Sequence, residues 1–221
     1  EAGEAYLAAA QVSLRAFEYQ EGVGLIGRAR ECLLQSERVL PGLEARIALT
    51  EGEVLRGLGR LEDSRKAATQ AVALFDKEGD EGAIARGVLE LCRLALLSGD
   101  YEQAEAELTR AKATLSGIEG EAAARANALQ LEAELYLCRG QMHRVKEPLD
   151  AAEAAWRAIG DTAGLASALN SRGRFLDRSS DFEGARAALT QAVHLRESIG
   201  ETPGLSSSLN NLGSVCEVLG D

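Results

Sequence analysis

Apolar and charged residues follow a helical pattern along almost the whole chain. Runs such as EGAIARGVLELCRLALLS at 81–98 place apolar side chains three and four positions apart, and each run is followed by a short polar turn. This spacing gathers the apolar side chains on one face of a helix. The chain therefore predicts a series of helices, each about 15 to 16 residues long and joined by short turns.

A glycine followed by a polar residue marks each turn at a fixed stride. The stride is 20 residues, once 21, and the marks are Gly59, Gly79, Gly99, Gly120, Gly140, Gly160, Ser180, Gly200 and Gly220. Glycine is favoured just after a helix because it enters the left-handed conformation without penalty. In seven of the nine cases the next residue is acidic, which suits the unpaired amides at the start of the following helix.

Alternate blocks resemble one another more than neighbouring blocks do. Leu169, Asn170 and Gly173 reappear forty residues later as Leu209, Asn210 and Gly213. The repeat is therefore a pair of antiparallel helices, and the fold class that it predicts is all-α, a solenoid of helix pairs.

The repeats divide the chain into five complete units and a partial sixth. We expect one continuous array over 1–221, in units of about 2–42, 43–80, 81–120, 121–160, 161–200 and 201–221. The expected helices are 4–17, 22–39, 43–59, 62–77, 81–98, 101–115, 122–139, 145–159, 162–178, 182–199 and a last one that begins after Pro203 and Gly204. Pro148 is expected near the start of its helix, where a missing amide costs little. The last helix has no partner and no polar cap, which predicts a fragment of a longer multidomain protein.

Small residues recur at three places in each unit. The first series is Ala10, Gly52, Cys92, Ala133, Gly173 and Gly213; the second is Gly22, Ser64, Ala104, Val145 and Ala185; the third is Ala29, Ala71, Ala111, Ala152 and Ala192. Small side chains at fixed places allow close approach of neighbouring helices, so these columns are expected to be buried contacts.

The columns, together with GDYEQA at 99–104 and LNNLG at 209–213, resemble the tetratricopeptide repeat (TPR). The period is longer than the usual 34 residues, and Leu169 and Leu209 replace the usual aromatic residue of the first helix. Such long repeats are similar to those of bacterial signal-transduction ATPases, maltose-regulator-like activators, kinesin light chain and polarity adaptor proteins. HEAT repeats share the forty-residue period but do not predict the three small columns.

The resemblance implies a right-handed superhelix whose first helices line a concave groove that holds a partner. Four positions in each first helix would line it. From these we take as candidate partner-binding residues Arg46, Leu49, Arg56, Arg86, Leu89, Arg93, Asn127, Gln130, Glu134, Asn170, Arg174, Asn210 and Asn211.

The candidate residues fall into two chemical groups. The second and third units supply four arginines among leucines, which suits an amphipathic segment with carboxylates, because arginine can hold a carboxylate by two parallel hydrogen bonds. The alternative is that they are ordinary solvated arginines, with Arg86 and Arg93 flanking Glu90. Later units supply amides, which can hold the backbone of an extended peptide. Inheritance of the repeat without any ligand explains Asn170 and Asn210 equally well.

Charge and composition exclude several classes of function. The formal net charge is −11, with 24 basic and 35 acidic residues, so nucleic acid and anionic membranes would be repelled by most of the surface. No stretch reads as a membrane span or a signal peptide. Cys32, Cys92, Cys138 and Cys216 have no CxxC spacing and are expected to be free, mostly buried thiols of a cytoplasmic protein.

Catalytic signals are weak, and the chain is interpreted as a non-enzyme with no cofactor and no metal. His143 and His194 have no nucleophile and base arranged around them, and no GxxxxGK[ST], HExxH or GxSxG string occurs. GVGLIG at 22–27 superficially resembles a phosphate loop, but it follows a helix rather than a strand.

Two function classes remain open. The favoured one is a protein-interaction scaffold in a bacterial regulatory or signalling protein, whose groove holds a partner peptide or a domain of its own polypeptide. The other is a ligand-sensing arm of a transcription activator or signal-transduction ATPase. A small-molecule pocket usually contains aromatic groups. The expected groove is poor in them, which favours the scaffold.

Overall fold

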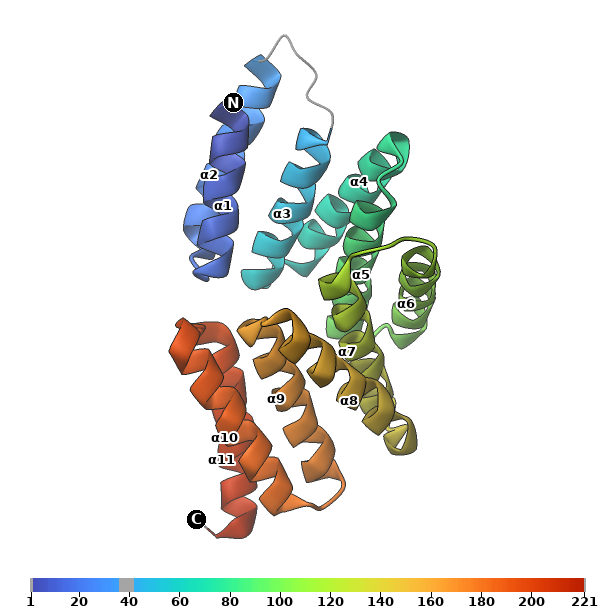
Figure 1. Ribbon diagram of the computed structural model, residues 1–221. Coiled ribbons are helices and arrows are strands. Elements are labelled where there is room, and N and C mark those ends of the chain that lie inside the picture. Colours follow the sequence, from blue (N-terminus) through green and yellow to red (C-terminus); the bar gives the residue numbers. More distant parts are fainter. Residues whose placement is uncertain (1, 36–41, 221) are drawn as a thin grey trace. The chain divides into compact units, whose positions relative to one another are not determined.

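The computed structural model describes residues 2–35 and 42–220, and within these ranges it contains eleven α-helices and no strand (Figure 1). The chain divides into two compact units, Glu1–Glu121 and Ala122–Asp221, each of which is described here by itself. The prediction of an all-α chain of helix pairs is confirmed. The single continuous array stays a prediction.

The first unit consists of three helix pairs. In each pair two consecutive helices pack along their length, and α3 also contacts α1 and α5. The helices are α1 (Ala2–Arg15), α2 (Tyr19–Gln35), α3 (Leu43–Gly57), α4 (Leu61–Glu78), α5 (Glu81–Leu97) and α6 (Tyr101–Ser116).

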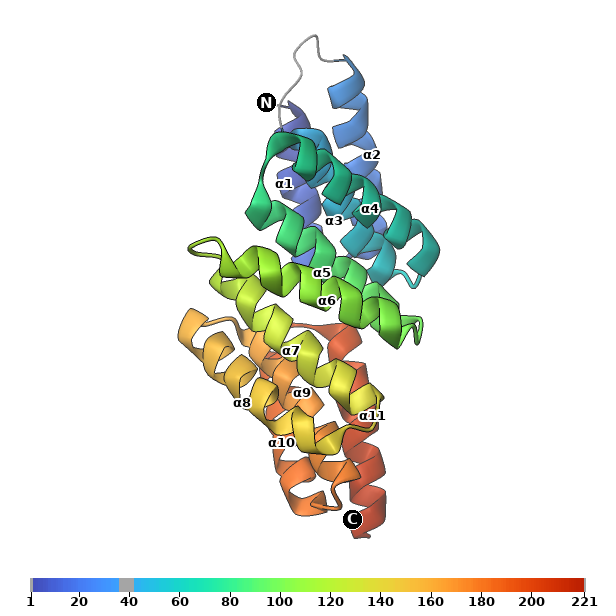
Figure 2. The ribbon, with the colours of Figure 1, turned by 90° about the vertical axis from the view of Figure 1, so that its right-hand side faces the viewer.

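The second unit consists of two pairs and one further helix. Figure 2 shows α7 and α8 side by side, and α9 contacts α7, α8, α10 and α11. The helices are α7 (Ala122–Cys138), α8 (Met142–Ile159), α9 (Thr162–Arg178), α10 (Phe182–Ile199) and α11 (Thr202–Leu219).

The turn marks adopt the backbone conformation that the sequence predicts. All nine have a positive φ, from 62° at Ser180 to 82° at Gly220. The acidic residue that follows caps the next helix in four cases, where its carboxylate accepts a hydrogen bond from the backbone amide three positions on. These caps are Asp80, Asp100, Asp161 and Asp181.

The three columns of small residues lie inside the helix pairs, as predicted. All five alanines of the third column have no exposed surface. Ser64 of the second column donates a hydrogen bond of 2.7 Å to the backbone carbonyl of Gly52 in the first. Gly213 is the exception, because it is exposed and an added Cβ would meet no atom within 4 Å.

Three helix starts differ from the prediction by three residues, more than the others do. Helix α2 begins at Tyr19 rather than at 22, after Phe17 takes the left-handed conformation with φ 61°. Helix α8 begins at Met142 rather than at 145, so Pro148 lies well inside it, where it cannot donate a hydrogen bond to the carbonyl of Arg144. Helix α11 begins at Thr202, and Pro203 lies in its first turn.

The expected end of the second helix and the expected burial of the cysteines were met only in part or could not be compared. The predicted end of the second helix at 39 falls outside the described residues. The four cysteines are free thiols, but Cys92 alone is fully buried among them and the other three are half-buried. No helix in the described ranges is both long and apolar enough to cross a membrane.

Candidate partner-binding surfaces

Charged side chains of α3 and α5 gather where these two helices meet in the first unit. Glu53 and Arg56 come from α3, and Arg86, Glu90 and Arg93 come from α5. We call these five residues the charge cluster. The helical spacing of three and four residues within each helix places them on facing sides.

Arg56 is held by Glu90 across the two helices. Its Nε donates a hydrogen bond of 2.6 Å to Oε1 of Glu90, whose side chain is 7% exposed. Burial disfavours the charge on Arg56, but the carboxylates of Glu90 and Glu53 outweigh it and raise the pKa of the guanidinium. Arg56 therefore serves chiefly to neutralise a buried carboxylate.

Glu53 has an unusual charge state. Burial, and then the negative charge of Glu90, raise the pKa of Glu53 to about 7, against the opposing pull of Arg56, Arg93 and Arg86. The side chain is therefore divided between its protonated and ionised forms near neutral pH. When it is protonated, the cluster carries more positive charge.

The other candidates of the first unit differ in their access to solvent. Arg86 is exposed and forms an ion pair with Glu121, and Arg93 is half-buried. Arg46 is exposed, and within the described ranges its side chain forms no hydrogen bond or ion pair. Leu49 is half-buried. Leu89 has no exposed surface and so belongs to the core, which corrects its placement on a binding surface.

Polar side chains form a second network, the amide cluster, within the second unit. Nε1 of Trp156 donates a hydrogen bond of 2.9 Å to Oε1 of Gln130, and Nε2 of Gln130 donates one of 3.0 Å to Oε1 of Glu134. The same carboxylate oxygen of Glu134 accepts a hydrogen bond of 3.2 Å from Ser171 on α9. Gln130 is 3% exposed, so it is a structural link rather than a surface group.

Asn170, the neighbour of Ser171 on α9, forms a separate set of hydrogen bonds with α11, which we include in the amide cluster. Its Oδ1 accepts hydrogen bonds from Oγ of Ser208, at 3.1 Å, and from Nδ2 of Asn211, at 3.0 Å. The Nδ2 group of Asn170 has no acceptor among the described residues, and its side chain is half-buried. One amide therefore joins two repeats and keeps its own donor available.

The remaining candidates of the second unit differ in their exposure to solvent. Asn127 is half-buried and Asn210 is exposed. Arg174 is half-buried, and its guanidinium has no hydrogen bond or ion pair in the part of the chain that the structure describes. No group of three or more His, Cys, Asp and Glu side chains among the described residues is arranged to hold a metal ion.

Sequence reasoning missed the residues that hold these clusters together. Glu90 appeared only as a neighbour of Arg86 and Arg93 along α5, whereas the contact in the structure is with Arg56 on α3. Trp156 and Ser208 were not candidates. Their partners lie 26 and 38 residues away, and the signal that could have suggested them is the repeat itself, which places 170 and 208 in adjacent first helices.

Comparison with known proteins identifies the fold. The chain matches no protein-family model and no curated protein. Among solved structures it is similar to a Rap protein complexed with competence and sporulation factor, with a TM-score of 0.74 and 12% identity over 99% of this chain and 71% of that one. It is also similar to BtubC (BKLC) from P. vanneervenii, with a TM-score of 0.62 and 17% identity over 91% of this chain and 94% of that one.

A third similar structure has a fold stated in its name. It is a variant of a Podosopora anserina putative kinesin light chain with nearly identical TPR-like repeats, with a TM-score of 0.60 and 15% identity over 90% of this chain and 96% of that one. Identities this low carry the fold alone. The chain has a TPR-like helical-repeat fold, as its small-residue columns predict.

Proposed function

We propose that this TPR-like chain is a protein-interaction scaffold, without catalytic activity, that binds a segment of another protein or a domain of its own polypeptide. The charge cluster with Arg46 and the amide cluster are its two contact surfaces. A cytoplasmic, bacterial regulatory or signalling protein is the setting that this role suits.

The observation that carries the proposal is the local excess of arginine in an acidic protein. The charge cluster holds Arg56, Arg86 and Arg93 with Glu53 and Glu90, and Glu121 pairs with Arg86. Arg46 adds a fourth arginine on the same face of α3, seven residues before Glu53, while the whole chain has a net charge of −11. Exposed Arg46 and Arg86 can hold a carboxylate of a partner by two parallel hydrogen bonds. The preferred partner is therefore an acidic, amphipathic segment.

The amide cluster supports a second kind of contact. The free donor of Asn170 and the exposed amide of Asn210 can bind the backbone carbonyls of an extended segment without selecting its side chains. A structurally similar Rap protein is known in complex with competence and sporulation factor, which is consistent with a partner held by this fold.

The test is capture of a partner from a lysate of the source cell, followed by titration with that partner in purified form. The double variant Arg46→Glu, Arg86→Glu should lose the partner. The matched control Arg28→Glu, Arg110→Glu makes the same change of charge at exposed positions of α2 and α6 and should retain it.

Two further results decide the outcome. Affinity should fall as salt rises, because exposed ion pairs are screened. Asn210→Ala should weaken the complex without altering that salt dependence. If the double variant and its control bind the partner equally, the arginine surface is not the contact.

A further inference from the structure

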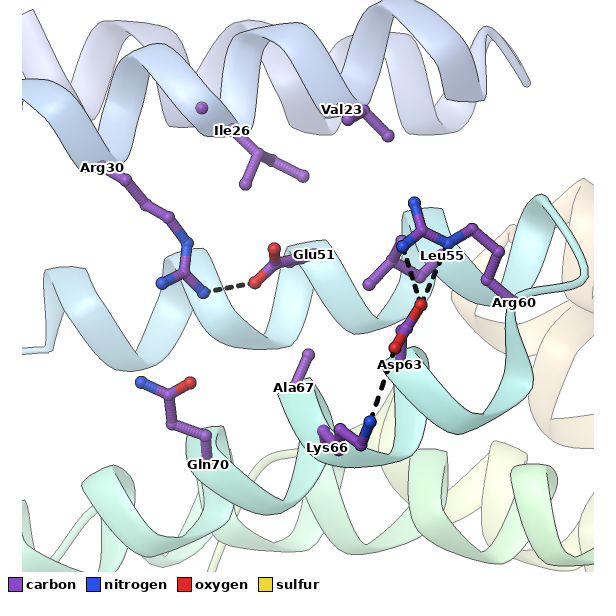
Figure 3. Close-up of a pocket in the computed structure, with 11 residues that line it drawn as sticks. Val23, Ile26, Arg30, Glu51, Leu55, Arg60, Asp63, Lys66, Ala67 and Gln70 are labelled. Atoms are coloured by element: carbon purple, nitrogen blue, oxygen red, sulfur yellow. Dashed lines mark hydrogen bonds and ion pairs between the residues drawn. The ribbon is translucent and has the colours of Figure 1, made fainter.

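A cleft of about 430 Å³ lies in the first unit, between α2 and α4. Figure 3 shows its two ends: Arg30 with Glu51 at one, and Arg60, Asp63 and Lys66 at the other. Helix α3 lies beside both α2 and α4. Apolar side chains from α2, α3 and α4 line the space between the two charged ends. The volume lies within the range of roughly 300 to 1,000 Å³ that is usual for small-molecule sites.

The cleft is separate from the proposed partner surface. Glu51 and Leu55 of α3 line the cleft, whereas Glu53 of the same helix belongs to the charge cluster. Residues two positions apart in a helix point to nearly opposite sides. A ligand in the cleft would therefore leave the charge cluster accessible.

Glycine keeps the α2 wall of the cleft open. Gly27 lines the cleft in the middle of a helix, where glycine costs about 1 kcal/mol relative to alanine. No close packing requires this glycine, because an added Cβ would meet no atom within 4 Å, and its φ is not in the left-handed region. The missing side chain leaves space that a ligand can use.

The charges of the lining are unevenly balanced. Arg30 forms an ion pair with Glu51, which leaves that end neutral. At the other end Arg60 and Lys66 share one carboxylate: Nη2 of Arg60 lies 2.7 Å from Oδ2 of Asp63, and Nζ of Lys66 lies 3.7 Å from Oδ1. This end therefore has one positive charge in excess.

We propose that the cleft binds a small amphipathic carboxylate. Its carboxylate would lie between Arg60 and Lys66 and take up the unbalanced charge. Its aliphatic body would lie over Ile26, Leu55 and Ala67, which form the apolar lining between the two ends. This site is additional to the partner-binding function and does not depend on it.

The test is calorimetric titration of the chain with octanoate, in the wild type and in a pair of glycine variants. Gly27→Leu places a side chain in the cleft. Gly24→Leu is the matched control, because Gly24 is also an exposed glycine of α2 with no atom near an added Cβ, but it does not line the cleft. Wild type and Gly24→Leu should bind octanoate equally, and Gly27→Leu should bind it at least about tenfold more weakly.

A second pair of measurements tests the role of charge. Lys66→Met keeps an unbranched side chain, one atom shorter, and removes its charge, and it should weaken binding of octanoate but not of 1-octanol. Equal octanoate binding by both glycine variants, or no binding by the wild type, would overturn the proposal. Capture of the protein partner should be the same for wild type and Gly27→Leu, which separates this site from the charge cluster.

Discussion

Glu53 has a carboxyl group whose ionisation opposes the folded state. Its pKa of about 7 in the fold exceeds the ordinary value of 4.5, so the folded chain binds this proton more tightly than the unfolded chain does. The contribution of Glu53 to the free energy of unfolding is therefore greatest below about pH 4.5 and falls as the pH rises through 7. Burial of the side chain, and then the negative charge of Glu90, raise this pKa, and the three arginines of the charge cluster partly offset the rise.

Glu53→Gln should remove that part of the pH dependence. Glutamine stays neutral at every pH, so the variant should gain stability relative to the wild type between about pH 5 and about pH 8. Urea unfolding of both proteins across this range measures the difference. A difference that does not change with pH would show that Glu53 titrates in the fold as it does in the unfolded chain.

Ser180 is the one turn mark that is not glycine. It holds a φ of 62°, a conformation that costs a residue with a Cβ about 1 kcal/mol or more. We expect Ser180→Gly to raise the free energy of unfolding by up to about 1 kcal/mol.

The adjacent residue provides the control for this change. Ser179 has a φ of −91°, and its Oγ donates a hydrogen bond of 2.8 Å to the carbonyl of Phe175. Ser179→Gly should therefore lower stability, as measured by chemical denaturation. If both substitutions act in the same direction, relief of the left-handed conformation is not the cause.

At the scale of helices, the alanine column fixes how closely the two helices of a pair approach. Ala152 of α8 has no exposed surface, and Ala154 of the same helix is exposed. Ala152→Leu should cost about 1 to 3 kcal/mol through overpacking, whereas Ala154→Leu should change stability by less than about 0.5 kcal/mol. Thermal unfolding of the two variants measures both effects, and equal losses would contradict the close contact.

Element positions were predictable where the turn chemistry repeats. Every Gly mark takes the left-handed conformation, because few other residues do so without strain. The predictions failed where local chemistry departs from the repeat. Phe17 takes the place of the turn glycine before α2, and Glu201 makes no side-chain cap at the start of α11. Neither helix start therefore has the full glycine-and-cap pattern from which the other starts were predicted.

Side-chain partners between helices were far less predictable than the helices. Along the sequence Glu90 has arginines four positions before it and three after it, yet in the structure its 2.6 Å contact is with Arg56, 34 residues away. The choice depends on how α3 and α5 pack and on which carboxylate is buried. Asn170 was identified as a candidate from its recurrence, but its two donors on α11 could be found only from the packing.

At the scale of the whole molecule, each described contact joins helices that are close in sequence. Within either unit a helix packs on its predecessor, its successor or the helix two positions away. A chain of this kind is stabilised by each repeat and its interfaces with neighbours, without a single central core. The charge cluster, the cleft and the amide cluster can therefore be altered separately, as the variants above require.

The two-residue turn, a left-handed glycine followed by an acidic residue, has a consequence for how such a protein changes length in evolution. The turn before 161–200 and the turn after it have the same backbone conformation, at Gly160 and Gly200. Deleting or duplicating such a block therefore rejoins a compatible helix end to a compatible helix start. Selection can then adjust the number of helix pairs in whole repeats while each pair keeps its local geometry.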